Sequence, residues 1–211
     1  MLTLLMDTTF QTLQLALADE NGIIERLCEP CSEYRYHSAI LIPRIEAMVK
    51  SQDLSVVAVN LGPGSFTGIR TGLTVARILG QFLGITCYGF NTFEVLSVAF
   101  APEPVTILLN AFRGQHYRAA LQTSATGEVT WLLQPEVLPN SSLTPLTTPH
   151  CLMEASLQDK IQIPNTQVID ENQLFTPEAM NLFLSHRTPI PWADLKPLYL
   201  QLPNITVSKS T

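Results

Sequence analysis

The run Gly62-Pro63-Gly64-Ser65-Phe66-Thr67-Gly68-Ile69-Arg70-Thr71-Gly72 is the most informative part of this chain. It follows a short apolar segment, Val56 to Leu61, that has the length of a buried strand, and it leads into a long helical pattern over 69–83. A glycine-rich turn between a strand and a helix presents backbone N–H groups that can bind an anion. The spacing nevertheless fits neither the phosphate-binding P-loop, nor the dinucleotide fingerprint, nor the nucleophile elbow. The structural alternative is a rigid turn in which Ser65 or Thr67 caps the helix.

The helix after this turn is apolar around most of its circumference and carries small residues at regular intervals. Gly72, Ala76, Gly80 and Gly84 recur every four residues, although glycine inside a helix costs about 1 kcal/mol relative to alanine. This stripe packs either on the sheet of its own lobe or against a partner, and the surplus of apolar residues favours the partner. The residues of this helix that we predict to contact a partner are Ile69, Arg70, Gly72, Leu73, Ala76, Arg77 and Gly80. For the two arginines, a solvated helix face and ion pairs to the partner remain equally open.

Composition sets the broad class of the protein. The 211 residues are 46% hydrophobic and 14% charged, with a net charge of -6, so wholesale disorder is excluded and direct charge-driven binding to nucleic acid is disfavoured. A role beside a partner that holds RNA remains open. No apolar run is long enough to span a membrane, and Asp7 interrupts the first one, which predicts a strand rather than a signal peptide. The expected location is the cytoplasm, with Cys28, Cys31, Cys87 and Cys151 reduced.

The two halves of the chain differ in composition but repeat one strand pattern. Eight of the ten glycines precede residue 90, and twelve of the fifteen prolines lie from Pro102 onward. We therefore predict a first lobe over 1–104 and a second over 105–211. The apolar run from Val105 ends at Asn110 as the first run ends at Asp7, and hairpin turns follow at Gly22 and Gly127, which indicates a duplicated unit. The predicted strands are 2–6, 13–18, 23–28, 56–61, 86–90, 105–110, 116–122 and 128–133, and the predicted helices are 37–51, 69–83 and 92–100.

With these features the whole chain resembles the TsaB (YeaZ) family of bacterial tRNA-modification proteins. The resemblance rests above all on the glycine-rich run, then on Leu4 to Thr9 and on His37 followed by Ile42-Pro43, and more weakly on 110–117 and 196–200. It implies an α/β, two-lobed, actin-like and Hsp70-like ATPase fold built from ribonuclease H-like repeats, with a reduced second lobe.

The resemblance also implies a function. It implies a non-catalytic subunit in the synthesis of N6-threonylcarbamoyladenosine (t6A) at position 37 of tRNAs that read ANN codons. Such a subunit binds and activates the homologous catalytic subunit TsaD, is joined by the ATPase TsaE, forms a homodimer when alone, and meets tRNA only through the complex. The pairing uses the first-lobe helices, which adds Leu41 and Ile45 to the predicted partner contacts.

The expected site residues follow from the same resemblance. Asp7, Thr8, Thr9, Gly64 and Ser65 are candidates for contact with a nucleotide or with the interface. No catalytic or metal-binding residue is expected, because the two metal-binding histidines of the catalytic paralogue align with Thr92 and Leu96. Asn110 stands where the family more usually has aspartate. We therefore expect a pseudo-enzyme without a tightly bound cofactor, with ATP and Mg²⁺ only in the assembled complex.

Two other interpretations remain. The chain could be a small ATP-dependent phosphotransferase of the actin-like superfamily, with Asp7 and Thr8-Thr9 near the phosphates. Cys28-x-x-Cys31 has the spacing of metal ligands, but a second such pair is missing from the sequence, so zinc binding is disfavoured and the role of these cysteines stays open.

Overall fold

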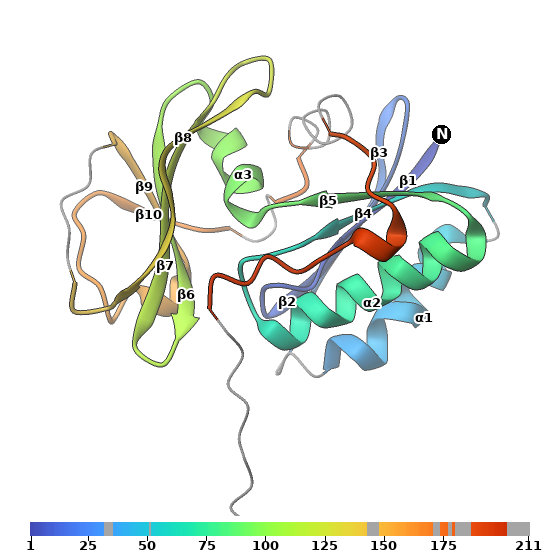
Figure 1. Ribbon diagram of the computed structural model, residues 1–211, viewed down its shortest axis with the longest axis horizontal. Helices are drawn as coiled ribbons and strands as arrows, with labels where there is room; N and C mark the ends of the chain where they lie inside the picture. Colours follow the sequence, from blue (N-terminus) through green and yellow to red (C-terminus); the bar gives the residue numbers. More distant parts are fainter. Residues whose placement is uncertain are drawn as a thin grey trace, which may run out of the picture.

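The protein consists of two five-stranded sheets, each at the centre of one lobe (Figure 1). The computed structural model describes residues 1–31, 36–50, 52–142, 148–170, 174–176, 179 and 187–201. The strand order is β3-β2-β1-β4-β5 in the first sheet and β10-β9-β6-β7-β8 in the second. None of the described helices is both long enough and apolar enough to cross a bilayer.

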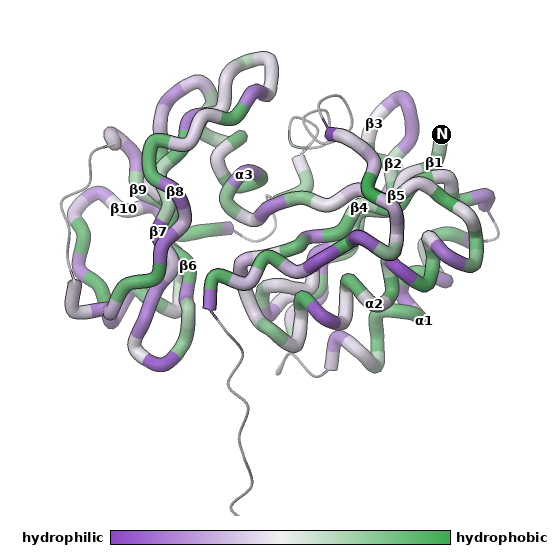
Figure 2. Tube along the Cα trace, viewed as in Figure 1, coloured by the Kyte–Doolittle hydropathy of each residue, from purple (hydrophilic) through white to green (hydrophobic). Residues whose placement is uncertain are grey.

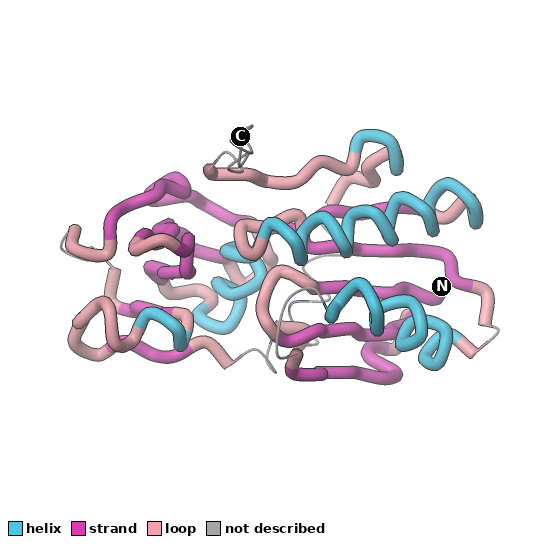
Figure 3. Tube along the Cα trace, turned by 90° about the horizontal axis from the view of Figure 1, so that it is seen from below, coloured by secondary structure: helices cyan, strands magenta, loops and turns pink. Residues whose placement is uncertain are grey.

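The first lobe pairs an antiparallel meander with two parallel strands. The strands β1 (Leu2–Asp7), β2 (Thr12–Asp19) and β3 (Gly22–Pro30) form the meander, and β4 (Leu54–Asn60) and β5 (Thr86–Phe90) run parallel to β1. The helices α1 (His37–Val49) and α2 (Phe66–Leu83) lie side by side on one face of this sheet (Figure 3). Figure 2 shows that β1 and β4 are largely hydrophobic, as central strands with both faces covered should be.

The second lobe repeats the topology of the first. After α3 (Thr92–Ser97) and a 3-10 turn (Val98–Phe100), the strands β6 (Val105–Phe112), β7 (Gln115–Thr123) and β8 (Val129–Pro139) form an antiparallel meander. The strands β9 (His150–Met153) and β10 (Thr166–Val168) then run parallel to β6. The duplicated strand unit predicted from the sequence is thus present in the topology. Between β9 and β10, where the first lobe has α2 between β4 and β5, the described part of this lobe has the 3-10 turn Ala155–Leu157.

Several predicted elements differ from the structure, and β8 ends at Pro139 rather than at the predicted residue 133. The helix α2 begins at Phe66, three residues earlier than predicted, because Ser65 caps it by accepting a hydrogen bond from the N–H of Gly68 at 3.3 Å. The strands β9 and β10 were not predicted, since each spans four residues or fewer and shows no clear alternation.

A segment from the end of the chain returns to the first lobe. Residues 187–201, here called the C-terminal strap, run alongside α2 (Figures 1 and 3). The backbone N–H of Ile190 donates to the carbonyl of Cys87 at 2.8 Å, and that of Leu198 donates to the carbonyl of Leu61 at 2.7 Å. Leu195 is fully buried in the first-lobe core. The predicted second lobe over 105–211 therefore includes a segment that packs on the first.

A closed polar centre and an exposed helical face

The polar residues predicted to lie near a nucleotide form a cluster at the carboxyl ends of β1 and β4. Asp7 ends β1 and is only 1% exposed. One of its carboxylate oxygens accepts hydrogen bonds from the N–H and the hydroxyl of Thr9, both at 2.7 Å. The other accepts from the side-chain amide of Asn60 at 2.6 Å. Both oxygens of Asp7 are therefore bound by groups of the chain itself.

The cluster continues through Asn60 and Thr92. The side-chain oxygen of Asn60 accepts from the N–H of Gly62 at 2.8 Å and lies 3.1 Å from the hydroxyl of Thr92. That hydroxyl also lies 2.8 Å from the carbonyl of Pro63. Thr92 thus ties α3 to the glycine-rich turn. Among the described residues, no three His, Cys, Asp or Glu side chains lie together in a way that could hold a metal ion.

Burial controls the titration of this centre. It raises the pKa of Asp7, although hydrogen bonds from Thr9 and Asn60 act in the opposite direction. Burial also lowers the pKa of His37, which is completely covered at the start of α1 and whose Nε2 lies 3.1 Å from the carbonyl of Gln11. These are the shifts of groups enclosed in a folded core, and each is driven first by desolvation.

The glycines of the turn allow it to press against the residues after β1. A Cβ added to Gly68 would lie 1.7 Å from the carbonyl oxygen of Thr8, and one added to Gly64 would lie 2.6 Å from Cβ of Thr9. The Thr8 hydroxyl donates to the carbonyl of Gly68 at 2.7 Å, and the N–H of Ser65 donates to the carbonyl of Thr9 at 2.9 Å. Asp7, Thr8, Thr9, Gly64 and Ser65 are therefore brought together as expected, but their polar groups bind one another.

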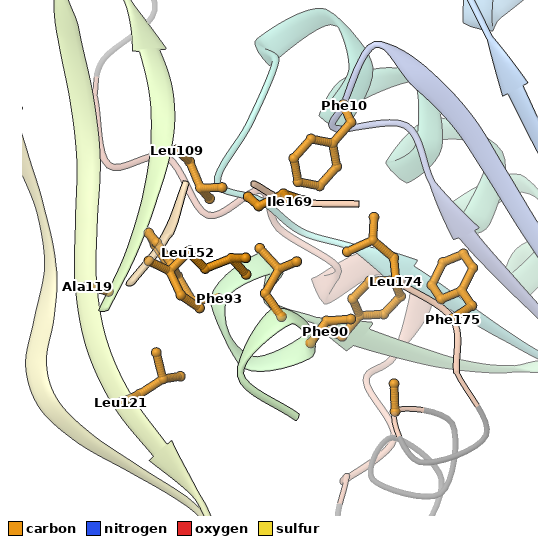
Figure 4. Packing of buried hydrophobic residues seen from close by; sticks show 14 of the residues in the cluster. Phe10, Phe90, Phe93, Leu109, Ala119, Leu121, Leu152, Ile169, Leu174 and Phe175 are labelled. Atoms are coloured by element: carbon orange, nitrogen blue, oxygen red, sulfur yellow. The ribbon is translucent and has the colours of Figure 1, made fainter. Parts of the chain in front are cut away.

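The space between the lobes is filled with hydrophobic side chains. Leu5 and Phe10 of the first lobe and Leu109 and Ala111 of the second belong to one buried cluster, and Ile169 packs among them (Figure 4). In an actin-like fold this region lies between the two halves. Here it is a continuous core that joins them.

Asn110 does not face Asp7 across this core. Leu109 and Ala111 point into the interlobe cluster, so strand alternation turns Asn110 to the opposite face of the second sheet, with Leu108. Its side-chain amide donates to the hydroxyl of Ser156 at 3.0 Å, and its side-chain oxygen accepts from the N–H of Phe112 at 2.8 Å. Asn110 therefore binds Ser156 and the backbone of its own turn on the face of the sheet that points away from the interlobe core.

The stripe of small residues on α2 packs inside the protein. A Cβ on Gly72 would lie 2.6 Å from the hydroxyl of Thr8, and one on Gly80 would lie 2.4 Å from Sγ of Cys87 and 2.8 Å from Cβ of Trp192. Ala76 is fully buried. The prediction that this stripe meets a partner is therefore wrong, because it already meets the sheet and the C-terminal strap.

Four of the other predicted partner contacts are also covered by the chain. The residues that belong to the buried core under the helices are Leu41, Ile45, Ile69 and Leu73. Of the two arginines, Arg70 is exposed and donates from Nε to the Tyr199 hydroxyl at 2.9 Å, whereas Arg77 donates to the carbonyl of Leu195. Both arginines thus bind the strap, an arrangement that neither interpretation of the sequence included.

The outward side of the α1–α2 pair carries large apolar side chains that the sequence analysis did not select. Ile42, Ile78, Phe82 and Leu83 are 41%, 46%, 77% and 58% exposed, and we call them the outer helical face. Beside Leu83, a cavity of about 540 Å³ lies between the ends of the two helices and is lined in part by Val49, Leu54 and Leu79.

A signal for this face is present in the sequence. Residues 74, 78 and 82 lie two positions from the stripe 72, 76 and 80, which places them about 200° around the helix. Once the stripe of small residues is known to pack on the sheet, residues 74, 78 and 82 are expected to face outward.

The cysteine pair shows no site. Cys28 is exposed on β3 and Cys31 is buried just after it, where burial raises the pKa of the Cys31 thiol. The positions of the two residues therefore do not support the metal site that their spacing suggested.

Comparison with known proteins places this geometry among relatives. The sequence model of the family described as tRNA N6-adenosine threonylcarbamoyltransferase (TsaD) matches residues 22–183. The tRNA threonylcarbamoyladenosine biosynthesis protein TsaB of Bacillus subtilis is 30% identical over 129 residues, or 58% of this chain and 56% of that protein. The protein of the same name from Escherichia coli is 26% identical over 149 residues, or 64% and 63% of the two chains. The matched sequence thus spans little more than half the length of the Bacillus relative.

Two solved structures share the fold over almost their whole length. One, from Pseudomonas aeruginosa, is described as an uncharacterized protein with similarity to peptidase YEAZ; its TM-score is 0.76 at 18% identity, covering 95% of this chain and 99% of that one. The second, YeaZ from the same organism, gives 0.72 at 18% identity, covering 94% and 99%. The predicted two-lobed α/β fold is confirmed by these matches together with the repeated sheets.

Proposed function

The chain belongs to the TsaB (YeaZ) group of the TsaD-type tRNA N6-adenosine threonylcarbamoyltransferase family, and on this basis we propose that it is a non-catalytic subunit in the synthesis of t6A in tRNA. In this proposal it binds and activates a TsaD-like catalytic subunit. A TsaE-like ATPase joins the two, and tRNA is met only through the complex. Any ATP and Mg²⁺ act in the assembled complex, and the isolated chain pairs with a second copy of itself.

The observation that carries the proposal is the outer helical face. Leaving a large apolar side chain in water forgoes about 1.5–3 kcal/mol of burial free energy per residue. Ile42, Ile78 and Phe82 lie on two neighbouring helices, so one partner could cover all three. Exposed apolar groups concentrated on one face are typical of a protein–protein interface.

The closed polar centre supports the absence of catalysis. A carboxylate that binds Mg²⁺ must offer its oxygens to the ion, whereas those of Asp7 already accept hydrogen bonds from Thr9 and Asn60. A phosphotransferase activity of the isolated chain has no comparable support.

Substitutions on the outer helical face test the proposal. We expect Ile78→Asp combined with Phe82→Asp to weaken binding to the TsaD-like subunit by about 2 kcal/mol or more, because each buries a charge in an apolar contact. Isothermal titration calorimetry with that subunit from the same organism measures the effect. The matched control is Leu132→Asp, which changes a side chain 52% exposed on β8 and should leave binding unchanged.

Circular dichroism should show both variants folded, since the substituted side chains lie in solvent. Unchanged affinity in the folded double variant would contradict the proposed interface.

A further inference from the structure

The C-terminal strap holds one exposed arginine of α2 in a defined orientation. The guanidinium of Arg70 donates from Nε to the Tyr199 hydroxyl at 2.9 Å, and its central carbon lies 5.9 Å from the centre of the Tyr199 ring. The ring of Phe66 packs against Tyr199 with 5.0 Å between ring centres. Tyr199 is in turn fixed by its neighbour Leu198, whose N–H donates to Leu61. Arg70 is thus held by Tyr199, which is itself fixed by the packing of Phe66 and by the hydrogen bond between Leu198 and Leu61.

The contact with Tyr199 leaves the terminal N–H groups of the Arg70 guanidinium available to a ligand. The hydrogen bond to Tyr199 uses Nε, and within the described part of the chain no carboxylate forms a salt bridge with Arg70. The contrast with Arg44 is informative, because that arginine makes a bidentate pair with Glu29 at 2.6 and 2.9 Å. The free edge of a planar guanidinium is suited to a carboxylate or phosphate, which it binds through two parallel hydrogen bonds.

Arg70 lies at one end of the outward row of α2. Residues 70, 74, 78 and 82 are spaced by four and therefore follow one side of the helix. The apolar members, Ile78 and Phe82, occupy the C-terminal end of the row, and Arg70 occupies the N-terminal end, where it meets Tyr199 of the strap. An apolar contact bordered by a fixed arginine is the usual anatomy of a specific interface.

We infer that Arg70, positioned by Tyr199 of the C-terminal strap, is an anchor that binds a carboxylate of the protein covering the outer helical face. This inference rests on the proposed function and adds to it the chemistry of the partner surface and a role for the strap. A carboxylate on a protein surface fits better than an RNA phosphate, because the contact continues the exposed apolar face of Ile78 and Phe82. Arg70 is the anchoring residue, and Tyr199 is a positioning residue.

The first experiment measures association with the TsaD-like subunit by surface plasmon resonance at two salt concentrations. We expect R70Q to weaken binding by about tenfold or more and to reduce its salt dependence. Y199F keeps the ring but loses the hydroxyl, and we expect a smaller loss of about threefold, mainly in the dissociation rate. The control R113Q makes the same charge change at an exposed position of the second lobe and should leave binding unchanged.

Two further measurements test whether the ligand of Arg70 is a carboxylate and whether Tyr199 positions Arg70. The R70K variant places an amine at the site, so carbodiimide coupling should form an amide with the partner's carboxylate, which mass spectrometry then locates. In the isolated chain, the ¹⁵Nε–H signal of Arg70 should broaden or shift in Y199F and not in R113Q. This last readout does not depend on any partner.

The outcomes separate the inference from the proposed function. If R70Q binds the TsaD-like subunit normally while the double substitution at Ile78 and Phe82 does not, the proposed function stands and the inference is wrong. If R70Q instead lowers only the affinity of the assembled complex for tRNA, the guanidinium binds phosphate, and the inference is again overturned. Loss of binding in R70Q together with an R70K cross-link to a partner carboxylate supports it.

Discussion

Asp7, at the end of the first strand, is bound by the chain around it. Its two carboxylate oxygens accept hydrogen bonds from Thr9 and Asn60. A buried carboxyl group that accepts from several donors is costly to remove, since its loss leaves each donor unsatisfied.

Removing this acceptor should therefore lower stability. We expect Asp7→Ala to reduce the free energy of unfolding by about 2–4 kcal/mol, measured by urea denaturation, because the amide of Asn60 and the hydroxyl of Thr9 both lose their partner. If the variant keeps its stability but abolishes an ATP turnover that the native chain has, Asp7 is catalytic and the alternative phosphotransferase interpretation is correct.

A double substitution tests the network itself. In Asp7→Asn alone, the new side-chain amide at position 7 lies against the side-chain amide of Asn60, and both groups are donors. Asn60→Asp in the same chain restores a donor–acceptor pair and still accepts from Gly62. We expect the double variant to recover most of the stability that Asp7→Asn loses. Additive losses in the two single variants would mean that the pairing does not carry the effect.

At the level of elements, the sequence predicted most of the first lobe and less of the second. The strands 2–6, 13–18 and 86–90 and the helix over 92–100 were predicted near their observed positions, because apolar alternation and an Asn91 cap define them locally. The strands β9 and β10 were missed, since strands that short carry too little pattern. The docking of the strap was missed because it depends on contacts with residues more than 100 positions away.

The same limit applies to the site. The sequence predicted both helices and named residues that form the polar cluster, but it could not orient α2, because apolar and small residues surround that helix. Periodicity shows that several faces are suited to packing and does not show which of them the protein's own sheet covers. Only the contacts of Gly72 with Thr8 and Val59 resolve this.

The strap should contribute to the stability of the first lobe. Leu195 is fully buried there, and the N–H and carbonyl groups around it bind β5, α2 and the residue after β4. We expect Leu195→Ala to lower the free energy of unfolding by about 2–4 kcal/mol, as cavity-forming substitutions do. Urea denaturation followed by Trp192 fluorescence measures it, and Lys196→Ala, at the exposed neighbouring position, is the control. A loss below about 0.5 kcal/mol would show that the strap is only loosely docked.

For the whole molecule, the interlobe core joins the two lobes. Phe10 of the first lobe, Leu109 of the second and Ile169 belong to a single buried cluster. The same cluster joins the two sheets, so we expect the lobes to unfold together. The described part of the chain thus combines a buried interlobe core with large apolar side chains exposed on α1 and α2.

Lowering the pH should reduce the unfolding free energy of the protein through its buried histidines. Burial lowers the pKa of His37 and of His116, so each is neutral in the folded protein and takes up a proton more readily after unfolding. Their contribution to stability is complete above the unfolded value of 6.5 and is lost as pH falls through the lower folded values, by up to about 1.4 kcal/mol per pH unit for each. Asp7 and Glu154 act in the opposite direction, because burial raises the pKa of both carboxyls and acid therefore favours their folded form.

The histidine contribution is separable from the carboxyl contribution by substitution. We expect the unfolding free energy of His37→Gln and of His116→Gln, measured in urea between pH 7.5 and 5.5, to fall less steeply with decreasing pH than that of the native chain. Each variant lacks one histidine that takes up a proton on unfolding. The test is therefore the slope of the unfolding free energy against pH, compared between variant and native chain, even where the variant is less stable at every pH. Because the two sites are independent in the structure, the double variant should show the shallowest dependence. Identical slopes in the native chain and both variants would mean that neither histidine is held neutral by the fold.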